Sequence, residues 1–340
     1  MKIDTKQFLR TAVETIDDES LQAAYEKGML RFTTARNAAY DLVPDVEELR
    51  DELKQVREAT IRNLGHHLET FERNAQAAGA TVHWARNAQE VGQIVLEIAK
   101  KQRTRLAVKS KSMVTEEVQL NAVLEEEGIK VVETDLGEYV IQLAGERPSH
   151  IIAPAVHQTA RKVAHLFTEK LHQNVEETPE ALTRVARATL RQMFLEAEIG
   201  ISGANLGVAE TGSIVLVTNE GNGRMVTSLP PVHIAVMGIE RLAPDWQAAS
   251  VWLSLLARSA TGQAMSIYTS VVTGPARQDD LDGPEEVHII LLDHNRSAML
   301  GTKYEEMLEC IRCGACLSVC PVYKESGGHA YHSPYSGPVG

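Results

Sequence analysis

Ile234-Ala235-Val236-Met237 is one of the short apolar runs that decide the fold of this chain. Similar runs span residues 214–217, 266–272 and 287–292. All of them are continuous rather than alternating between apolar and polar residues, which is typical of strands that are buried on both faces. A glycine-containing turn at residues 219–223 separates two of the runs. The runs therefore predict a buried sheet in the second half of the chain.

Upstream of these runs, short apolar segments alternate with segments of helical periodicity. The predicted elements are strands at residues 106–108, 129–133 and 151–153 and helices at residues 115–127, 157–171 and 175–198. Alternation of this kind builds a sheet with helices on its faces. The sequence therefore predicts an α/β fold.

Helical signals dominate the N-terminal region. From Val46 to Phe71 the apolar positions mostly recur every three or four residues, with Pro44 before this helix and a glycine after it. We interpret this region as a helical arm that serves packing or subunit contact. A short helix is also predicted at residues 302–309, whereas residues 325–340 are rich in Gly, Ser and Pro and are expected to be poorly ordered in isolation.

The bulk composition excludes some classes of protein. The chain has 340 residues, of which 44% are hydrophobic, so a sizeable core can be buried. Its 34 basic and 46 acidic side chains leave a formal charge of -12, and an acidic chain repels phosphate backbones. We therefore expect no nucleic-acid partner. The N-terminus carries no secretory signal and no stretch approaches the roughly 18–20 apolar residues that span a bilayer, so we expect a cytoplasmic protein without a transmembrane segment.

All four cysteines lie in one short stretch near the end of the sequence. It reads Cys310-Ile-Arg-Cys313-Gly-Ala-Cys316-Leu-Ser-Val-Cys320-Pro, which is the C-x2-C-x2-C-x3-C-P run of bacterial ferredoxins. Thiolates are soft ligands that suit iron–sulfur clusters, and Gly314 allows the backbone to approach the sulfides closely. The spacing therefore predicts a 4Fe-4S cluster with these four cysteines as ligands.

The spacing alone leaves two alternatives. A structural zinc site is one, but paired zinc knuckles usually stand a dozen or more residues apart, whereas these cysteines are contiguous. The other concerns Cys320, because in two-cluster ferredoxins the fourth cysteine of a motif ligates the other cluster. Cys320 therefore either completes one local cluster or belongs to a longer module with a second motif.

Two loops of the α/β region carry side chains that suit a small anion. Lys109-Ser110-Lys111 follows a predicted strand, and ligands of open α/β sheets bind beyond the carboxyl ends of strands. Glu210-Thr211-Gly212 precedes another strand, and a nearby arginine gives bidentate contacts to a carboxylate. The alternatives are a solvated turn and structural hairpin turns with a surface arginine. The predicted substrate-binding residues are Lys109, Ser110, Lys111, Glu210, Thr211, Gly212, Asn222, Arg224 and His233.

No catalytic residue is assigned from a motif. The sequence lacks a nucleotide P-loop, a dinucleotide fingerprint, a metalloprotease helix and a serine-hydrolase elbow. Glu133, Asp135 and Glu138 follow the strand after Lys109, where they either pair with the lysines or cap the next helix.

Seven strings of this sequence together resemble the lactate-utilisation protein B family. They are KSKSMVTEEVQLN (109–121), ETDLGEYVIQL (133–143), PSHIIAPAVH (148–157), AETGSIVLVTNEGNGR (209–224), SLPPVHIAVMGIER (228–241), DGPEEVHIILLDHNR (282–296) and CIRCGACLSVCPVY (310–323). The strings occur in the family's order, and most of them are too long to be generic. Proteins of this family are iron–sulfur proteins of bacterial operons that oxidise L-lactate to pyruvate.

The resemblance implies a domain organisation. Residues 1–69 would be the helical arm, and residues 70–297 a lactate-utilisation α/β domain related to the fold of sugar-phosphate isomerases and CoA transferases. Residues 298–340 would be an incomplete ferredoxin-type segment. Family members usually continue into a second cysteine motif, so we expect a truncated chain that holds one 4Fe-4S cluster where longer members hold two.

The resemblance also implies partners and a reaction. The partners would be a cysteine-rich subunit and a shorter relative with the same α/β domain, and the small molecules would be L-lactate and pyruvate. Because a cluster transfers one electron at a time, this chain is predicted to be the electron-transfer subunit of an oxidoreductase complex. The alternatives are an α/β enzyme for small carboxylates with a structural cluster, or a non-functional fragment of a longer protein.

Overall fold

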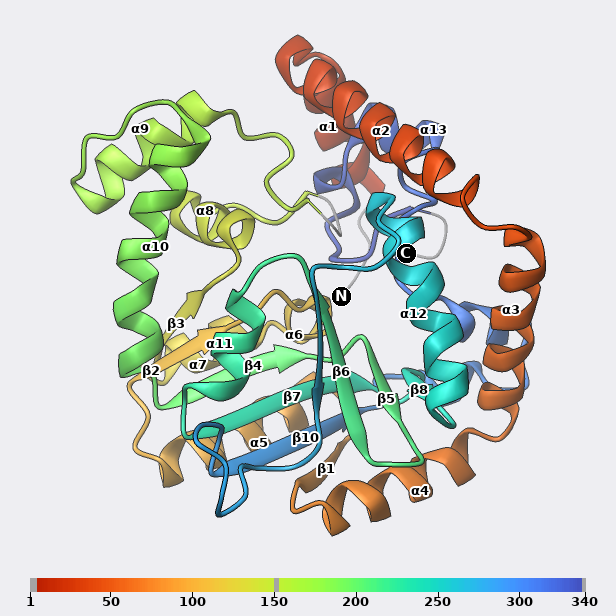
Figure 1. The fold of residues 1–340 in the computed structure, drawn as a ribbon. Helices are drawn as coiled ribbons and strands as arrows, with labels where there is room; N and C mark the ends of the chain where they lie inside the picture. The colour runs from red at the N-terminus through yellow and green to blue at the C-terminus, as the bar shows by residue number, and fades with distance from the viewer. Residues whose placement is uncertain (1–4, 150–152, 338–340) are drawn as a thin grey trace.

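The structure, a computed structural model, describes residues 5–149 and 153–337. Helices at the N-terminus run beside an α/β part, and the C-terminal segment returns to lie against the first two helices (Figure 1). The strand predicted at residues 151–153 lies outside the described residues except for Ala153, which belongs to no strand. Among the described residues, no helix is long and apolar enough to cross a membrane.

The main sheet is parallel throughout and six-stranded within the described residues. Its strands, in spatial order, are β1 (Thr81–Ala85), β10 (Glu286–Leu292), β7 (Val232–Gly238), β4 (Ile199–Gly203), β2 (Leu106–Lys109) and β3 (Lys130–Glu133). The register places Ile290 beside Val236 and Ile234 beside Ile201 in the centre of the sheet. The continuous apolar runs at residues 234–237 and 287–292 are therefore confirmed as buried parallel strands, because neighbours and helices cover both faces.

A smaller mixed sheet crosses the main one (Figure 1). Its strands, in spatial order, are β8 (Leu242–Ala243), β5 (Leu206–Val208), β6 (Ser213–Thr218) and β9 (Tyr268–Val272). The prediction that the run at residues 266–272 is buried on both faces is wrong. Strand β9 pairs with β6 at the edge of this sheet, and its side chains alternate between exposed and half-buried.

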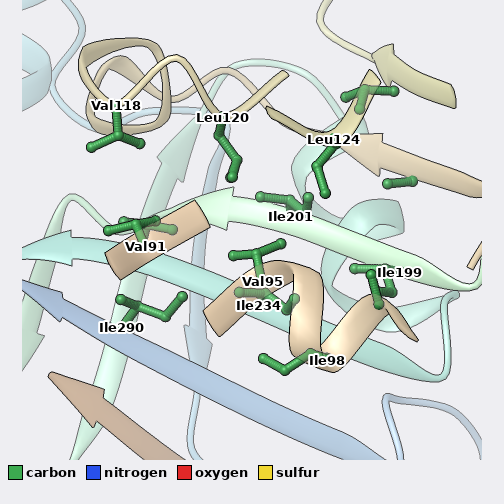
Figure 2. Packing of buried hydrophobic residues seen from close by; sticks show 14 of the residues in the cluster. Val91, Val95, Ile98, Val118, Leu120, Leu124, Ile199, Ile201, Ile234 and Ile290 are labelled. Carbon is green, nitrogen blue, oxygen red and sulfur yellow. The ribbon is translucent and has the colours of Figure 1, made fainter. Parts of the chain in front are cut away.

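One face of the main sheet is covered by helices that pack apolar side chains onto the central strands (Figure 2). These helices are α5 (Ala88–Lys101), α6 (Met113–Glu117) and α7 (Leu120–Glu126). Val91 and Val95 of α5 lie against the same core as Ile201 and Ile234. The single helix predicted at residues 115–127 is interrupted, because Gln119 adopts a left-handed conformation with φ 54°.

The remaining helices of the α/β part pack against other parts of the two sheets. They are α8 (Leu136–Ala144), α9 (Ala160–Leu171), α10 (Pro179–Glu196), α11 (Asn222–Ser228) and α12 (Trp246–Thr261). Phe167 of α9 and Phe194 of α10 are buried in one cluster with Val108 and Val132 of the sheet. The helices predicted at residues 157–171 and 175–198 are thereby confirmed with slightly shorter bounds.

The N-terminal arm is helical as predicted, in four segments of the described chain. They are α1 (Thr5–Ile16), α2 (Glu19–Tyr40), α3 (Val46–Arg62) and α4 (Leu64–Ala77). The helix predicted to run without a break from Val46 divides at Asn63, whose φ of -111° departs from helical geometry. Phe71 of α4 is fully buried against the α/β part, so α4 belongs to the core rather than to a separate arm.

The C-terminal segment packs between the arm and the α/β part. It contains the short helices η1 (Ser297–Met299), η2 (Glu305–Glu309), α13 (Pro321–Ser326) and η3 (His329–Tyr331). Tyr323 is buried beside Met29 of α2, and its hydroxyl donates to the carbonyl oxygen of Ser149 at 2.6 Å. The tail was expected to be poorly ordered only in isolation, and in the whole chain its described part is held by these contacts.

Candidate functional site

A cavity of about 610 Å³ lies at the carboxyl end of the main sheet. Its wall includes Gly203 at the end of β4 and Gly238 at the end of β7, together with Lys111 after β2. Helix α12 and the cysteine loop, which contributes Arg312 and Cys313, close the other side. The position agrees with the general rule that ligands of open α/β sheets bind beyond the strand ends.

Three of the predicted substrate-binding residues line this cavity: Ser110, Lys111 and Asn222. Lys109 lies behind the wall and is only 1% exposed, with its Nζ 2.6 Å from Glu133 Oε1. Burial alone would lower the pKa of Lys109, but Glu133 and other carboxylates outweigh it and raise this pKa. Lys109 is thus a buried, permanently charged residue that fixes the end of β2 rather than a residue that touches a ligand.

Lys111 is the lysine of this loop that reaches the cavity. Its Nζ lies 3.8 Å from Glu138 Oε1, and Glu138 is 4% exposed. Burial, and next the charge of Glu116, raise the pKa of Glu138 well above its usual range. Burial therefore favours the protonated form of Glu138 over the charged form beside Lys111.

The other predicted residues are not brought to the cavity. The Glu210-Thr211-Gly212 turn packs on α4, and Asn74 donates to the carbonyl oxygen of Glu210 at 2.9 Å. Strand β6 separates this turn from Arg224, which is exposed on α11, so the expected pairing of turn and arginine does not occur. His233 is the second residue of β7, at the opposite end of this strand from Gly238 and the cavity, and its Nε2 lies 2.8 Å from Ser202 Oγ.

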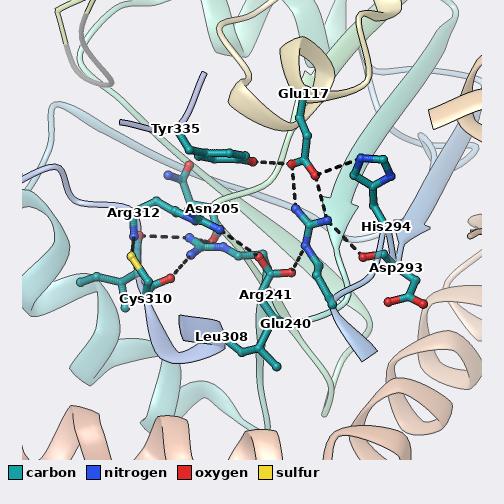
Figure 3. A network of polar contacts seen from close by, with 12 residues as sticks. Glu117, Asn205, Glu240, Arg241, Asp293, His294, Leu308, Cys310, Arg312 and Tyr335 are labelled. Atoms are coloured by element: carbon teal, nitrogen blue, oxygen red, sulfur yellow. Dashed lines mark hydrogen bonds and ion pairs between the residues drawn. The ribbon is translucent and has the colours of Figure 1, made fainter. Parts of the chain in front are cut away.

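A network of charged side chains that the sequence did not reveal joins the cavity to the cysteine loop (Figure 3). Glu117 receives two hydrogen bonds from Arg296, at 3.1 and 2.8 Å, and one from Tyr335 at 2.6 Å. Arg296 Nε lies 2.7 Å from Glu240 Oε2, and Arg312 Nη2 lies 4.0 Å from Glu240 Oε1. The network therefore links the ends of separate strands to the loop that carries the cysteines.

Gly238 makes room for this network. A Cβ at this position would lie 2.1 Å from Glu240 Oε2 and 2.7 Å from Arg296 Nε, so these two side chains would have to move. The sequence signal was the order glycine, then Glu240-Arg241, directly after a buried strand. It was missed because the partners Glu117 and Arg296 lie far away along the chain.

The cysteine loop follows η2 and has two left-handed residues, Arg312 with φ 60° and Gly314 with φ 73°. The backbone N–H of Arg312 donates to Cys310 Sγ at 3.5 Å. Burial raises the pKa of the Cys316 thiol, and charges on Cys313, Cys310 and Cys320 act on it as well. The four thiols are thus close enough to interact electrostatically around one loop.

Arginines hold this loop, and helix η2 just before it, through main-chain carbonyl oxygens. Arg36 of α2 donates to Ala315 at 3.0 Å, and Arg57 of α3 donates to Leu308 at 2.8 Å. Arg241, which follows β7, donates to Cys310 at 3.0 Å. The loop is therefore fixed by the arm and by the α/β part together.

The residues present fit a four-iron cluster. Among residues 5–149 and 153–337, no three His, Cys, Asp or Glu side chains are grouped closely enough for a single metal ion. A four-iron cluster needs a different ligand geometry, because each thiolate binds a different iron and the cysteine sulfur atoms therefore stand farther apart than around a single ion. Four soft donors on one loop, a peptide N–H aimed at a sulfur and nearby arginine charges meet that requirement.

Comparison with known families agrees with both parts of the fold. A family model described as "LUD domain" matches residues 68–292. Another, described as "4Fe-4S dicluster domain", matches residues 306–340 and indicates an iron–sulfur cofactor. The chain is thus a LUD-domain protein with an iron–sulfur segment.

Similarity to characterised proteins extends over the whole chain. It is 44% identical over 341 residues to "Lactate utilization protein B" of Bacillus velezensis, an alignment that covers 100% of this chain and 72% of the relative. The protein of the same name from Bacillus subtilis is 45% identical over 341 residues, covering 100% of this chain and 71% of the relative. The chain belongs to the lactate utilization protein B family. A crystal structure of a DUF162 family protein from Deinococcus radiodurans matches 67% of this chain and 98% of its own, with 12% identity and a TM-score of 0.38.

Proposed function

We propose that this chain is the iron–sulfur electron-transfer subunit of a system that oxidises L-lactate to pyruvate. The observation that carries the proposal is that the cysteine loop opens into the cavity of the α/β domain, since Arg312 and Cys313 form part of its wall. A small carboxylate bound there would lie beside the cluster-binding loop. The name of the Bacillus relatives supports lactate as the substrate.

In this proposal Cys310, Cys313, Cys316 and Cys320 bind one 4Fe-4S cluster. When bound, such a cluster supplies one-electron transfer at this loop. The oxidation removes two electrons and two protons from lactate. The chain's own residues in the cavity wall bind and orient the carboxylate.

The proposal includes the setting in which the chain works. We propose a cytoplasmic complex with a cysteine-rich subunit and a shorter relative that has the same α/β domain. This chain would pass electrons onward inside that complex. A second candidate function, an enzyme for small carboxylates with a purely structural cluster, is favoured by the cavity itself and is separated by the experiments below.

The test is the metal content of the chain. After anaerobic purification and reconstitution we expect about four irons and four sulfides per chain and a paramagnetic signal after reduction. Serine at Cys310, Cys313 or Cys316 should remove most of the iron, and Cys320→Ser decides whether the fourth ligand is local. Val319→Ala, an exposed position in the same loop, is the matched control. A wild-type chain that holds no iron would contradict the proposal, and a cluster that cannot be reduced would favour the second candidate.

A further inference from the structure

Two arginines are buried beside the cysteine loop without a carboxylate partner. Arg57 of α3 is 1% exposed, and Arg241, which follows β7, is 6% exposed. In the part of the chain that the structure describes, neither guanidinium forms an ion pair with Asp or Glu. A buried charge is costly unless a charge of opposite sign balances it. The loaded protein should therefore hold a negative group near these two residues.

The hydrogen bonds of the arginine pair (Arg57 and Arg241) go to neutral main-chain oxygens. Arg57 donates to three carbonyl oxygens, and one of them, on Leu308 just before the cysteine loop, is 2.8 Å away. Arg241 donates to carbonyl oxygens as well, among them Cys310 at 3.0 Å and Ile311 at 3.3 Å (Figure 3). A carbonyl oxygen satisfies an N–H group but carries no net charge. Both positive charges thus remain at the start of the loop.

One aromatic ring holds the arginine pair together. Trp252 is fully buried, and its ring centroid lies 4.3 Å from the Cζ of Arg57 and 4.8 Å from the Cζ of Arg241. The face of the ring attracts both cations, although their like charges repel each other. Burial lowers the pKa of Arg57 to about 9 and that of Arg241 to about 10, so both are charged at neutral pH.

The other buried charges of this region balance one another. Arg296 Nη2 lies 2.8 Å from Glu117 Oε2, and its Nε lies 2.7 Å from Glu240 Oε2. Arg312 lies 4.0 Å from the other oxygen of Glu240. Two arginines therefore face two carboxylates in this network, and the arginine pair over the tryptophan ring is a surplus of two positive charges.

The nearby acidic side chains at the surface do not remove this surplus. Glu309 precedes Cys310 and is half-buried, and no ion pair joins it to the arginine pair in the described chain. Burial, and next the charge of Glu58, raise the pKa of Glu309, which weakens its negative charge. The carboxylate of Asp293 binds the backbone N–H and the hydroxyl of Ser297, both at 2.7 Å.

An iron–sulfur cluster has the charge that the arginine pair lacks. Four thiolates and a four-iron core together carry a net negative charge, and reduction adds one more. The guanidinium of Arg241 is held at the first cysteine of the loop, and that of Arg57 at the helix before it. Positive charge at this distance stabilises the reduced cluster more than the oxidised cluster, because the reduced cluster is the more negative of the two.

We infer that Arg57 and Arg241 are the buried counter-charges of the cluster and that they raise its reduction potential. The inference rests on the cluster of the proposed function and deepens it, because it names the residues that decide how readily the cluster accepts an electron. Both arginines act on the cluster through space, and neither is a ligand of iron.

The test is a redox titration of the full chain with its reconstituted cluster, followed by electron paramagnetic resonance. Arg57→Gln keeps an N–H donor but removes the charge, so the reduction equilibrium should fall about tenfold, which lowers the midpoint potential by about 59 mV. Arg57→Lys keeps the charge but loses the planar donors, and its potential should stay near that of wild type. Arg62→Gln is the matched control, because its side chain is 69% exposed on the same helix, and it should leave the potential unchanged.

Two results of this titration would overturn the inference. Equal potentials in Arg57→Gln, Arg57→Lys and wild type would show that the charge does not act on the cluster. An equal fall in both variants would show that Arg57 acts through the shape of the loop instead. If the variants at Arg57 do not fold, the same pair of changes at Arg241 takes their place.

The wild-type chain supplies a measurement that needs no variant. Buried counter-charges are not screened, so the potential should be the same at about 0.1 M and about 1 M salt. A potential that rises with salt would show that mobile ions balance the cluster, and the inference would be wrong.

Iron and sulfide are measured on every sample, so failure of the inference and failure of the proposed function can be told apart. A full cluster whose potential ignores the charge at Arg57 and Arg241 overturns the inference alone. A wild-type chain that holds no iron refutes the proposed function, and the inference falls with it. A wild-type cluster that cannot be reduced also contradicts the inference, because surplus positive charge makes reduction easier.

Discussion

Tyr335 donates a hydrogen bond of 2.6 Å to Glu117, and so connects the segment after the cysteines to helix α6, which follows β2. Burial, and next the charge of Glu117, raise the pKa of Tyr335, so the hydroxyl keeps the proton that it donates. The same ring carries the Arg312 guanidinium on its face. One aromatic side chain thus sets the position of both the cavity wall and the arginine of the cysteine loop.

We expect Tyr335→Phe to loosen the segment after the cysteines. The lost bond has a charged acceptor and is worth about 1.5–3 kcal/mol, so amide hydrogens of residues 329–337 should exchange faster. Hydrogen-exchange mass spectrometry measures this directly. Tyr304→Phe, at a side chain that is 53% exposed, is the control and should leave the exchange pattern unchanged. Identical exchange in Tyr335→Phe and wild type would show that the bond does not hold the segment.

Arg57→Met is expected to lower the free energy of unfolding by about 2–4 kcal/mol, because buried carbonyl oxygens lose their donor. Arg57 is 1% exposed and donates to the carbonyl oxygens of Leu242, Glu240 and Leu308. Burial, and next the charge of Arg241, lower the pKa of Arg57 to about 9, so it is still charged at neutral pH. Urea unfolding followed by tryptophan fluorescence gives the number. Arg62→Met, exposed on the same helix, should change stability by less than about 0.5 kcal/mol. A similar small effect at Arg57 would contradict the prediction.

Gly238→Ala is expected to disrupt the pair between Glu240 and Arg296. The added Cβ would come within 2.1 Å of Glu240 Oε2, and overpacking of this kind costs about 1–3 kcal/mol. We expect a lower unfolding free energy together with weaker pyruvate binding in the same protein. Gly65→Ala is the matched control, because a Cβ there meets nothing within 4 Å and lies in a helix. It should be neutral or stabilising by about 0.5–1 kcal/mol, and equal behaviour of the two variants would refute the steric argument.

His233 should make the protein less stable in acid. Burial lowers its pKa from 6.5 to about 4, so the unfolded chain takes up a proton that the folded chain does not. The contribution of His233 to stability is therefore complete above pH 6.5 and is lost as the pH falls toward 4. At pH 5 the loss is about 2 kcal/mol. Urea unfolding at pH 7 and pH 5 should show a shallower pH dependence for His233→Gln than for wild type or for the exposed-site control His165→Gln. An unchanged dependence would show that His233 is not its source.

The sheet could be predicted from sequence because its signals are local. A continuous apolar run such as Ile234–Met237 predicts a buried strand without any knowledge of distant residues, and the spacing of the cysteines likewise predicts cluster ligands. The burial of strand β9 was predicted wrongly because two valines end a strand whose other residues are Tyr, Thr and Ser. Its position at the edge of the sheet depends on which strands pair with it, and the local sequence does not show that. The break at Gln119 is likewise set by packing, since glutamine carries no signal for positive φ.

The candidate site was only half predictable for the same reason. Lys111 could be placed because it follows a strand directly, and the strand end is where ligands gather. Glu117, Glu240 and Arg296 look like ordinary surface charges in the sequence, and they become a network only when three elements meet. For Arg224 the sequence suggested a ligand contact that the structure does not place at the cavity: the residue follows β6, but its side chain on α11 faces solvent.

The grip of Arg36, Arg57 and Arg241 on main-chain oxygens has a consequence for engineering. The iron–sulfur family model begins at residue 306, yet the atoms that shape the cysteine loop lie in α2, in α3 and after β7. We therefore do not expect the segment to keep this loop conformation when it is moved to another protein. On another scaffold the segment would keep its cysteines but lose the arginines that fix the backbone of the loop. Where those arginines contact only a carbonyl oxygen, the side chain of that loop residue can be substituted without losing the contact.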